Sequence, residues 1–199
     1  MDARAHATAT DLCARLAGRL ADDTLRGVRQ DYFGGEARQA ETTLLLSLAH
    51  EGVGITRVER TMIRSTLDDP DDPDLAAVAI IDAPPPPPYR FFPVAPPHAP
   101  SPAPADAVLA ERAPLQGGKR LLRAWREPVS QAPDQAAWVY VVQVERGVDR
   151  LRVHSGLVSH LWVRARATWP VEVVEDGATL PPYQAAALAA AREIRAAKG

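Results

Sequence analysis

His154, Ser155 and His160 combine a hydroxyl with two imidazoles within the stretch HSGLVSH. A serine beside a histidine is the minimum for nucleophilic catalysis, because the imidazole can take the proton from the attacking hydroxyl. No Gly-x-Ser-x-Gly turn surrounds Ser155, however. Two histidines without a cysteine or carboxylate at a supporting spacing do not predict a metal site. We therefore interpret Ser155 as the N-cap of a helix and predict no catalytic residue, metal or cofactor.

The stretch QGGK, Gln116 to Lys119, has some features of a phosphate-binding loop. It lacks the upstream glycine and the Ser or Thr that follows the lysine in such loops, and no strand is predicted before it. We interpret it as a glycine hinge. An enzyme remains an alternative function, with a site between the two halves of the chain that is built from residues distant in sequence.

Basic residues near Trp125 and Trp162 form a second chemical pattern. Arginines beside exposed aromatic rings are typical of nucleic-acid binding. Acidic residues interrupt this run, and both tryptophans fit core positions. A nucleic-acid adaptor is kept as an alternative function. Because of the interrupting acidic residues, nucleic acid is not the partner that we expect. The basic residues concerned are Lys119, Arg120, Arg123, Arg126, Arg150, Arg152, Arg164 and Arg166.

An acidic run with two prolines, LDDPDDPD, contains Asp68, Asp69, Asp71, Asp72 and Asp74. It lacks the glycine at the sixth position and the glutamate at the twelfth position of a calcium-binding loop. Its structural interpretation is a solvated turn. Its functional interpretation is an anionic patch for a basic protein partner, and these five aspartates are our first candidate binding residues.

The proline tract at residues 82–105 holds eleven of the nineteen prolines, yet it carries Tyr89, Phe91 and Phe92 in its middle. Aromatic rings bury large apolar areas, and a plain spacer has no need of them. We predict that this YRFF stretch packs on one of the chain's own domains and fastens the tract. The alternatives are a loose linker and a partner-recognition motif, so the three aromatic residues are also candidate binding residues.

Charge is divided unevenly along the chain. Residues 1–83 contain nine arginines and fifteen Asp or Glu residues, a net charge of −6. Residues 84–199 contain fourteen Lys or Arg and ten Asp or Glu residues, a net charge of +4. The whole chain has a net charge of only −2, which offers no bulk attraction to nucleic acid or to a membrane surface.

Composition indicates a globular protein of a reducing compartment. The chain has 199 residues, 46% of them apolar, and Cys13 is its one cysteine. No stretch approaches the length of a membrane helix, and the start has no continuous apolar segment of a secretory signal. Twenty-one arginines against two lysines, with abundant alanine, indicate a GC-rich bacterial genome. We expect a cytoplasmic bacterial protein without membrane partners.

The first 83 residues show helical periodicity. A first helix capped by Thr10 or Asp11 is expected, and a second that ends at Gly34-Gly35. A third has an apolar stripe of alanines and leucines, and a fourth opens with the capping-box pattern of Thr56 to Glu59. The positions predicted to face inward are Leu12, Leu16, Leu20, Leu25, Val28, Tyr32, Phe33, Ala37, Ala40, Leu44, Leu45, Leu48, Val58, Met62 and Ile63.

The second half mixes strands and helices. Residues 136–145, AAWVYVVQVE, are apolar on both faces and predict a central strand. Residues 117–127 are expected to form a short basic helix, residues 150–154 a strand and residues 171–177 a strand with its turn. Residues 155–169 are expected to form a helix, and an extension of the sheet is the alternative. A last helix is expected over residues 181–198. This order predicts helices on one face of a short sheet.

The segment from Thr24 to Leu67 resembles small bacterial immunity proteins of the MafI type. The likeness lies in a helix followed by the Gly35-Glu36 step, a stripe of alanine and then leucine, and a last helix that Thr56-x-x-Glu59 caps. The resemblance implies a helical protein that neutralises a partner toxin by binding it.

Together these patterns predict an α+β protein in three parts: an acidic helical bundle at 1–83, a proline-rich strap at 84–112, and a small α+β domain with a short sheet at 113–199. The leading functional hypothesis is a non-catalytic protein-binding module, and specifically an immunity-type inhibitor of a toxin. Its expected partner is another protein.

Overall fold

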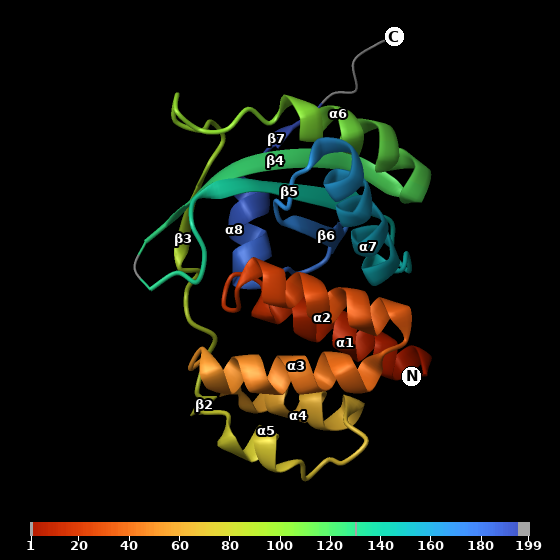
Figure 1. Cartoon of the computed structure of the whole chain (residues 1–199), viewed down its shortest axis with the longest axis vertical. Helices are drawn as coiled ribbons and strands as arrows, with labels where there is room; N and C mark the ends of the chain where they lie inside the picture. Colours follow the sequence, from red (N-terminus) through yellow and green to blue (C-terminus); the bar gives the residue numbers. More distant parts are fainter. Residues whose placement is uncertain (1, 130, 195–199) are drawn as a thin grey trace. The chain divides into compact units, whose positions relative to one another are not determined.

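The computed structural model describes residues 2–129 and 131–194 and divides the chain into two compact units, Met1–Pro87 and Pro88–Gly199 (Figure 1). Helices dominate the first unit and the larger sheet lies in the second, which confirms the α+β class. The division falls inside the proline tract. Residues 88–112, which the sequence assigns to the strap, therefore belong to the second unit.

Helices of the first unit pack through their apolar stripes. The core residues are Leu12, Leu16, Leu20, Leu25, Val28, Ala40, Leu44, Leu45, Leu48, Ile55 and Ile63. These helices are α1 (Ala3–Leu16), α2 (Asp22–Gly34), α3 (Ala37–His50), α4 (Arg57–Thr66) and the short α5 (Pro73–Ala77). The first unit also contains two short strands, β1 (Ile55–Thr56) and β2 (Ile80–Ile81), which pair in parallel.

Capping residues set the ends of the first two helices. The carboxylate of Asp2 accepts a hydrogen bond from the Ala5 amide at 2.8 Å, so α1 begins well before Thr10 and Asp11, the caps expected from the sequence. Gly35 ends α2 in the left-handed conformation, with φ of 85°, as predicted. The first helix is therefore longer than expected, and the second ends where expected.

The capping box of α4 is confirmed. The Thr56 hydroxyl accepts from the Glu59 amide, and the Glu59 carboxylate accepts from the Thr56 amide at 2.8 Å. The Glu59 carboxylate also forms an ion pair with the Arg19 guanidinium, with an N–O distance of 2.7 Å. The same guanidinium donates a hydrogen bond to the carbonyl oxygen of Gly54. This buried ion pair joins the turn after α1 to the start of α4.

Two side chains that were predicted to face inward, Phe33 and Val58, are exposed. Phe33 is one residue beyond the buried Tyr32, and one residue turns the side chain by about 100° around a helix. In α4 the buried face carries Ile63 and the capping carboxylate of Glu59. Val58, one residue before Glu59, is therefore turned out of this face into solvent.

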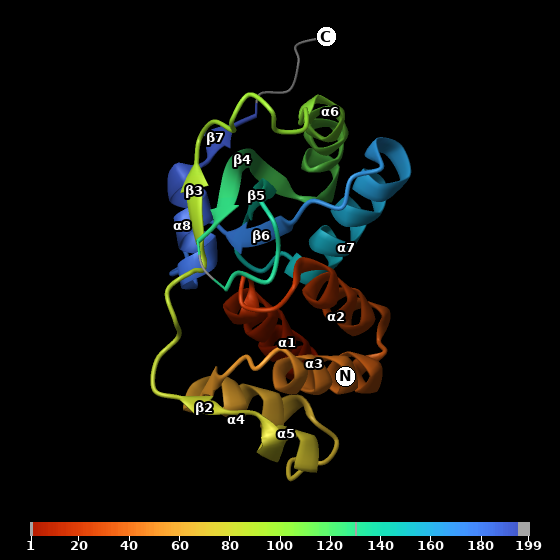
Figure 2. The same ribbon diagram turned by 60° about the vertical axis from the view of Figure 1, so that its left-hand side comes forward.

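A mixed sheet forms the centre of the second unit (Figure 2). Its order is β3 (Tyr89–Phe92), β4 (Gly118–Pro128), β5 (Ala137–Val144) and β6 (Val171–Glu175), and β7 (Arg192–Glu193) pairs with β4. Only the β5–β6 pair of this order is parallel. The helical segments are α6 (Ala103–Arg112), the 3₁₀ turn η1 (Pro114–Gln116), α7 (Arg150–His160), the π-helical η2 (Leu161–Ala165) and α8 (Pro182–Ala190).

Helices cover both faces of this sheet, not one face as expected (Figure 2). From β5, Tyr140 and Val142 face the core under α6 and α7, while Val139 and Val141 face α8. Two covered faces explain why this strand is apolar at successive positions. The prediction of a central strand at 136–145 is confirmed, because β5 lies between β4 and β6.

The expected basic helix at residues 117–127 is wrong, because this segment is β4. Leu121 and Trp125 are four residues apart, and this spacing puts two side chains on one face of a helix and also on one face of a strand. Pairing decides between the two, since the backbone of this segment gains partners from β5 along most of its length and from β3 over residues 125–128. Trp125 lies opposite Trp138 in the register, with ring centroids 5.2 Å apart.

The strand expected at residues 150–154 is wrong as well, because it forms the first half of α7. Asp149 caps this helix by accepting from the Arg152 amide at 3.1 Å, so Ser155 lies inside the helix and is not its cap. Parallel strands need a crossover connection, and α7 provides it between β5 and β6. The last predicted helix is shorter than expected: α8 ends at Ala190, and residues 195–198 lie outside the described residues.

Candidate partner-binding site

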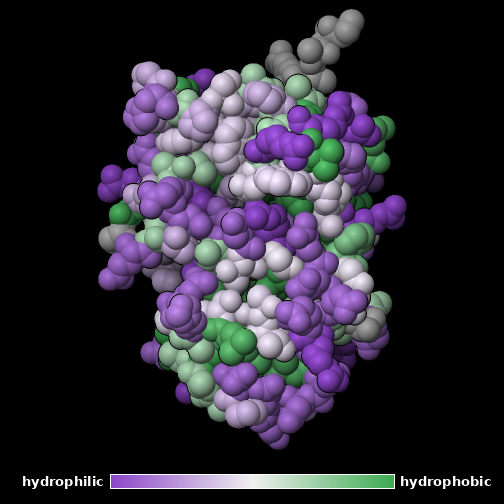
Figure 3. All heavy atoms as spheres, in the orientation of Figure 1, coloured by the Kyte–Doolittle hydropathy of each residue, from purple (hydrophilic) through white to green (hydrophobic). Residues whose placement is uncertain are grey.

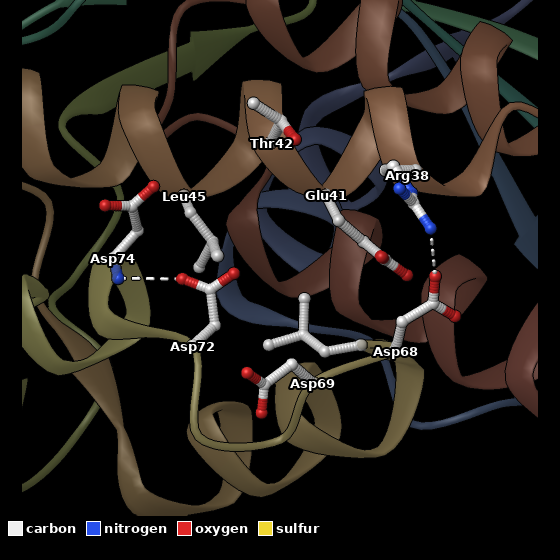
Figure 4. Close-up of a pocket in the computed structure, with 9 residues that line it drawn as sticks. Arg38, Glu41, Thr42, Leu45, Asp68, Asp69, Asp72 and Asp74 are labelled. Atoms are coloured by element: carbon white, nitrogen blue, oxygen red, sulfur yellow. Dashed lines mark hydrogen bonds and ion pairs between the residues drawn. The ribbon is translucent and has the colours of Figure 1, made fainter.

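A hollow of about 340 Å³ lies between α3 and the loop that joins α4 to α5 (Figure 4). Figure 4 shows Glu41 and Leu45 projecting from α3 toward the aspartates of the loop. Figure 3 shows hydrophilic surface at the lower tip of the first unit, next to apolar surface over α3 and α5. The residues that line the hollow are Arg38, Glu41, Thr42, Leu45, Leu67, Asp68, Asp69, Asp72 and Asp74.

Local hydrogen bonds shape the loop. One carboxylate oxygen of Asp69 accepts from the Asp71 amide at 2.9 Å, and one of Asp72 accepts from the Asp74 amide at 2.8 Å. Asp72 is thereby the N-cap of α5, with Pro73 at the first helical position. Each of these two carboxylates keeps its second oxygen for another donor.

Glu41 is the buried acid of the hollow. Its side chain comes from the core-facing side of α3, and the residue is only 6% exposed. Within the part of the chain that the structure describes, its Oε1 atom has no hydrogen-bond partner. Burial, and after it the charge of Asp68, raise the pKa of the Glu41 carboxyl to about 7, against the opposing effect of the Arg38 charge.

Among the described residues that line the hollow, Arg38 is the one cation, and it pairs with Asp68 at 3.1 Å in an exposed position. The described lining therefore contains five carboxyl groups and one guanidinium. Four of the five aspartates predicted from the sequence line the hollow. Asp71 is not among the lining residues, and it pairs with Arg64 of α4 at 2.9 Å.

Sequence reasoning missed Glu41. A signal was present, since Glu41 is four residues before Leu45 and follows Ala40, so it interrupts the apolar stripe of α3. A charged residue at a core position is expensive to bury unless it has a partner. Such a residue is a candidate for binding, and here it lies beside the acidic run.

The three aromatic candidates belong to the second unit, whereas the five aspartates belong to the first. Tyr89 is 4% exposed; its ring meets Tyr183 edge-on at 5.8 Å, and its hydroxyl accepts from the Asp134 amide. Phe91 also meets Tyr183, at 5.2 Å. Phe92 keeps 36% of its surface exposed. The prediction that YRFF packs on the chain's own domain is confirmed, because it forms β3 at the edge of the sheet.

Buried polar groups gather beneath α8. Arg126 is fully buried, donates to the Tyr183 hydroxyl at 2.9 Å, and stacks over the Tyr89 ring at 4.4 Å. The amide of Gln184 donates to Glu172 at 2.7 Å, and both residues are buried. This cluster fastens α8 and β3 to the sheet through hydrogen bonds and ring contacts.

The basic residues of the second half are distributed among ion pairs. Arg123 pairs with Asp106, and the other pairs are Arg120 with Glu193, Arg164 with Glu111, Lys119 with Asp176, and Arg146 with Glu175. Carboxylates thus neutralise much of the arginine pattern near the two tryptophans. A nucleic-acid site needs exposed aromatic rings on which bases can stack. Trp162 is exposed and meets this need, whereas Trp125 is buried.

His154, Ser155 and His160 all lie on α7. His154 is buried, whereas Ser155 and His160 are half-buried. Their positions along one helix do not aim the three side chains at a common point, since six residues separate the histidines. Among the described residues, no three His, Cys, Asp or Glu side chains gather in a way that could hold a metal ion.

Comparison with known proteins found no matching family model, no matching curated protein and no matching solved structure. Among the described helices, none is long and apolar enough to cross a membrane.

Proposed function

We propose that the chain is a non-catalytic protein-binding module, and that the acidic hollow of its first unit accepts a basic side chain of a partner protein. The observation that carries this proposal is Glu41, a buried carboxyl with an oxygen that lacks a hydrogen-bond partner among the described residues. A buried acceptor without a donor costs free energy, and a partner's N–H group would offset that cost.

The surrounding charges favour the same partner. Asp68, Asp69 and Asp72 make the mouth of the hollow negative, and the first 83 residues carry a net charge of −6. Complementary potentials speed the encounter with a basic surface and disfavour acidic ones. A basic protein is therefore the expected partner.

An immunity-type role is the specific form of this proposal. The segment from Thr24 to Leu67 that resembles small bacterial immunity proteins includes α3 with Glu41, and it ends next to Asp68. In that role the chain would act in the bacterial cytoplasm by covering a basic site of a toxin. Many toxins that cleave nucleic acids would offer such a site, because their substrates are polyanions.

The experiment is an affinity capture of the full chain from its native host, with the bound proteins identified by mass spectrometry. The test variant carries Asp68→Asn, Asp69→Asn and Asp72→Asn. Asparagine keeps the acceptor oxygens that shape the loop, so the fold should persist. The matched control, Asp23→Asn with Asp71→Asn and Asp82→Asn, removes the same charge from residues outside the lining.

One stoichiometric protein that is lost from the test variant and kept by the control is the expected result. The purified chain should then inhibit the activity of that protein. A partner that both variants retain equally, or the capture of no protein, would contradict the proposal.

A further inference from the structure

We infer that the hollow is a binding site for a guanidinium group, and that Glu41 is the residue that selects it. The inference rests on the proposed function, because the guanidinium is assigned to an arginine of the partner protein. It goes further by naming the recognised group and the recognising atom.

The first argument is the distribution of acceptors. Glu41 offers Oε1 from α3, while Asp69 and Asp72 each offer one oxygen from the loop that faces it. These acceptors come from two elements on opposite sides of the hollow (Figure 4). A guanidinium has five N–H donors spread around a plane and can reach both sides, whereas an ammonium is a compact point charge.

The second argument is the apolar part of the lining. Leu45 and Leu67 contribute to the walls, and Leu45 is almost fully buried. A guanidinium is weakly hydrated and tolerates apolar surface against its faces, and the arginine stem gains from the same contact. An ammonium would lose more hydration in this setting. The volume of about 340 Å³ lies at the low end for small-ligand pockets, which suits one long side chain.

The third argument is that the chain's own arginine does not satisfy Glu41. Arg38 lies one turn before Glu41 on α3, but its guanidinium pairs with Asp68 at the exposed rim. Its charge acts on Glu41 without a hydrogen bond to it. The buried carboxyl therefore remains available to a second guanidinium that enters between α3 and the loop.

The test compares two monocations with the same stem, n-butylguanidine and n-butylamine, by titration of the full chain followed through its backbone amide NMR signals. We expect n-butylguanidine to shift the amides of α3 and of residues 67–74 in a saturable manner. Its affinity should exceed that of n-butylamine by about tenfold. Equal affinities for the two cations would overturn the inference.

Glu41→Gln is the decisive variant, and Asp71→Asn is its matched control on the same loop. We expect Glu41→Gln to weaken n-butylguanidine binding by about tenfold or more, while Asp71→Asn leaves it unchanged within about twofold. The amide spectrum of each variant outside the hollow reports whether it is folded. A folded Glu41→Gln variant that binds like the natural chain would overturn the role of Glu41.

Two further outcomes separate this inference from the proposed function. If n-butylguanidine binds through Glu41 but no protein depends on the loop aspartates, the site serves a free guanidinium compound and the protein-binding proposal is wrong. The opposite outcome is that capture of a protein partner requires the loop aspartates, while Glu41→Gln leaves the affinity for n-butylguanidine unchanged. In that case the guanidinium inference is wrong and the protein-binding proposal stands. With a partner identified, changing its contacting arginine to lysine should weaken the complex.

Discussion

Glu41 departs from the usual behaviour of its residue type because of where α3 places it. Burial, and after it the charge of Asp68, raise the pKa of its carboxyl from 4.5 to about 7. Between these two pH values the folded chain holds a proton that the unfolded chain has released. The stability contributed by this group is therefore complete below pH 4.5 and is lost as the pH rises through about 7.

This linkage predicts that Glu41→Gln stabilises the protein at pH 8. The gain should be on the order of 1–2 kcal/mol, less than the full shift implies because the hollow is open to solvent. At pH 4 the gain should vanish, since both side chains are then neutral. Urea unfolding at the two pH values measures it.

Other charges face Glu41 and must be kept constant in that comparison. Arg38 and Asp68 lie beside it, Asp69 and Asp72 lie across the hollow, and Tyr32 approaches it from α2. Asp71→Asn is a suitable control because it removes a loop charge outside the lining. A gain that is the same at pH 4 and pH 8 would contradict the assigned pKa.

At the scale of elements, β3 shows how a short aromatic stretch anchors a proline tract to a sheet. This strand pairs with β4, and the rings of Tyr89 and Phe91 pack against Tyr183 of α8. The tract beyond it is also held, since the Trp138 indole donates to the carbonyl of Pro100 at 2.8 Å. The strap thus becomes part of the second unit through backbone pairing and ring burial.

Two substitutions on this one strand test the anchoring. Tyr89→Ser removes a buried ring and should cost about 3 kcal/mol of unfolding free energy, with faster proteolysis of the tract. Phe92→Ser removes a partly exposed ring on the same strand and should cost less than about 1 kcal/mol. Chemical unfolding and limited proteolysis measure both. Equal and small costs would mean that the ring contacts of Tyr89 do not hold the strap.

The errors in predicting elements have a common origin. Leu121 and Trp125 fit both a helix and a strand, and the alternation of Leu151 and Val153 fits a strand, although α7 is helical. Short segments carry ambiguous periodicity. Pairing partners and the need for a crossover between parallel strands decide such cases, and neither is a local property.

At the scale of the whole molecule, the two units have separate cores. The leucine core and the acidic hollow belong to Met1–Pro87, and the sheet with its two covered faces belongs to Pro88–Gly199. The ion pair of Arg19 with Glu59 is internal to the first unit. Each unit therefore holds the contacts that its own core and site require.

This separation predicts that a fragment of residues 1–87 folds alone and keeps the binding behaviour of the hollow. Its size is sufficient for an independent though modest core. Circular dichroism should report a helical spectrum and cooperative thermal unfolding, and n-butylguanidine should shift the same amides as in the full chain. A fragment that lacks cooperative unfolding would contradict the prediction.

The sequence by itself determined the features that depend on neighbours along the chain. Gly35 ends α2, Thr56 and Glu59 cap α4, and the apolar run of β5 marks the central strand. The acidic loop was visible as well. These features follow from backbone geometry and side-chain spacing, which act over a few residues.

Only the tertiary structure decided which polar groups became the site. Asp68, Asp69 and Asp72 face the hollow while Asp71 faces Arg64, although all four stand in one run. Glu41 lies twenty-seven residues before Asp68 and meets it because α3 packs against the loop after α4. The burial of a side chain and its hydrogen-bond or ion-pair partner depend on contacts between segments that are distant in sequence. Local periodicity does not predict these contacts.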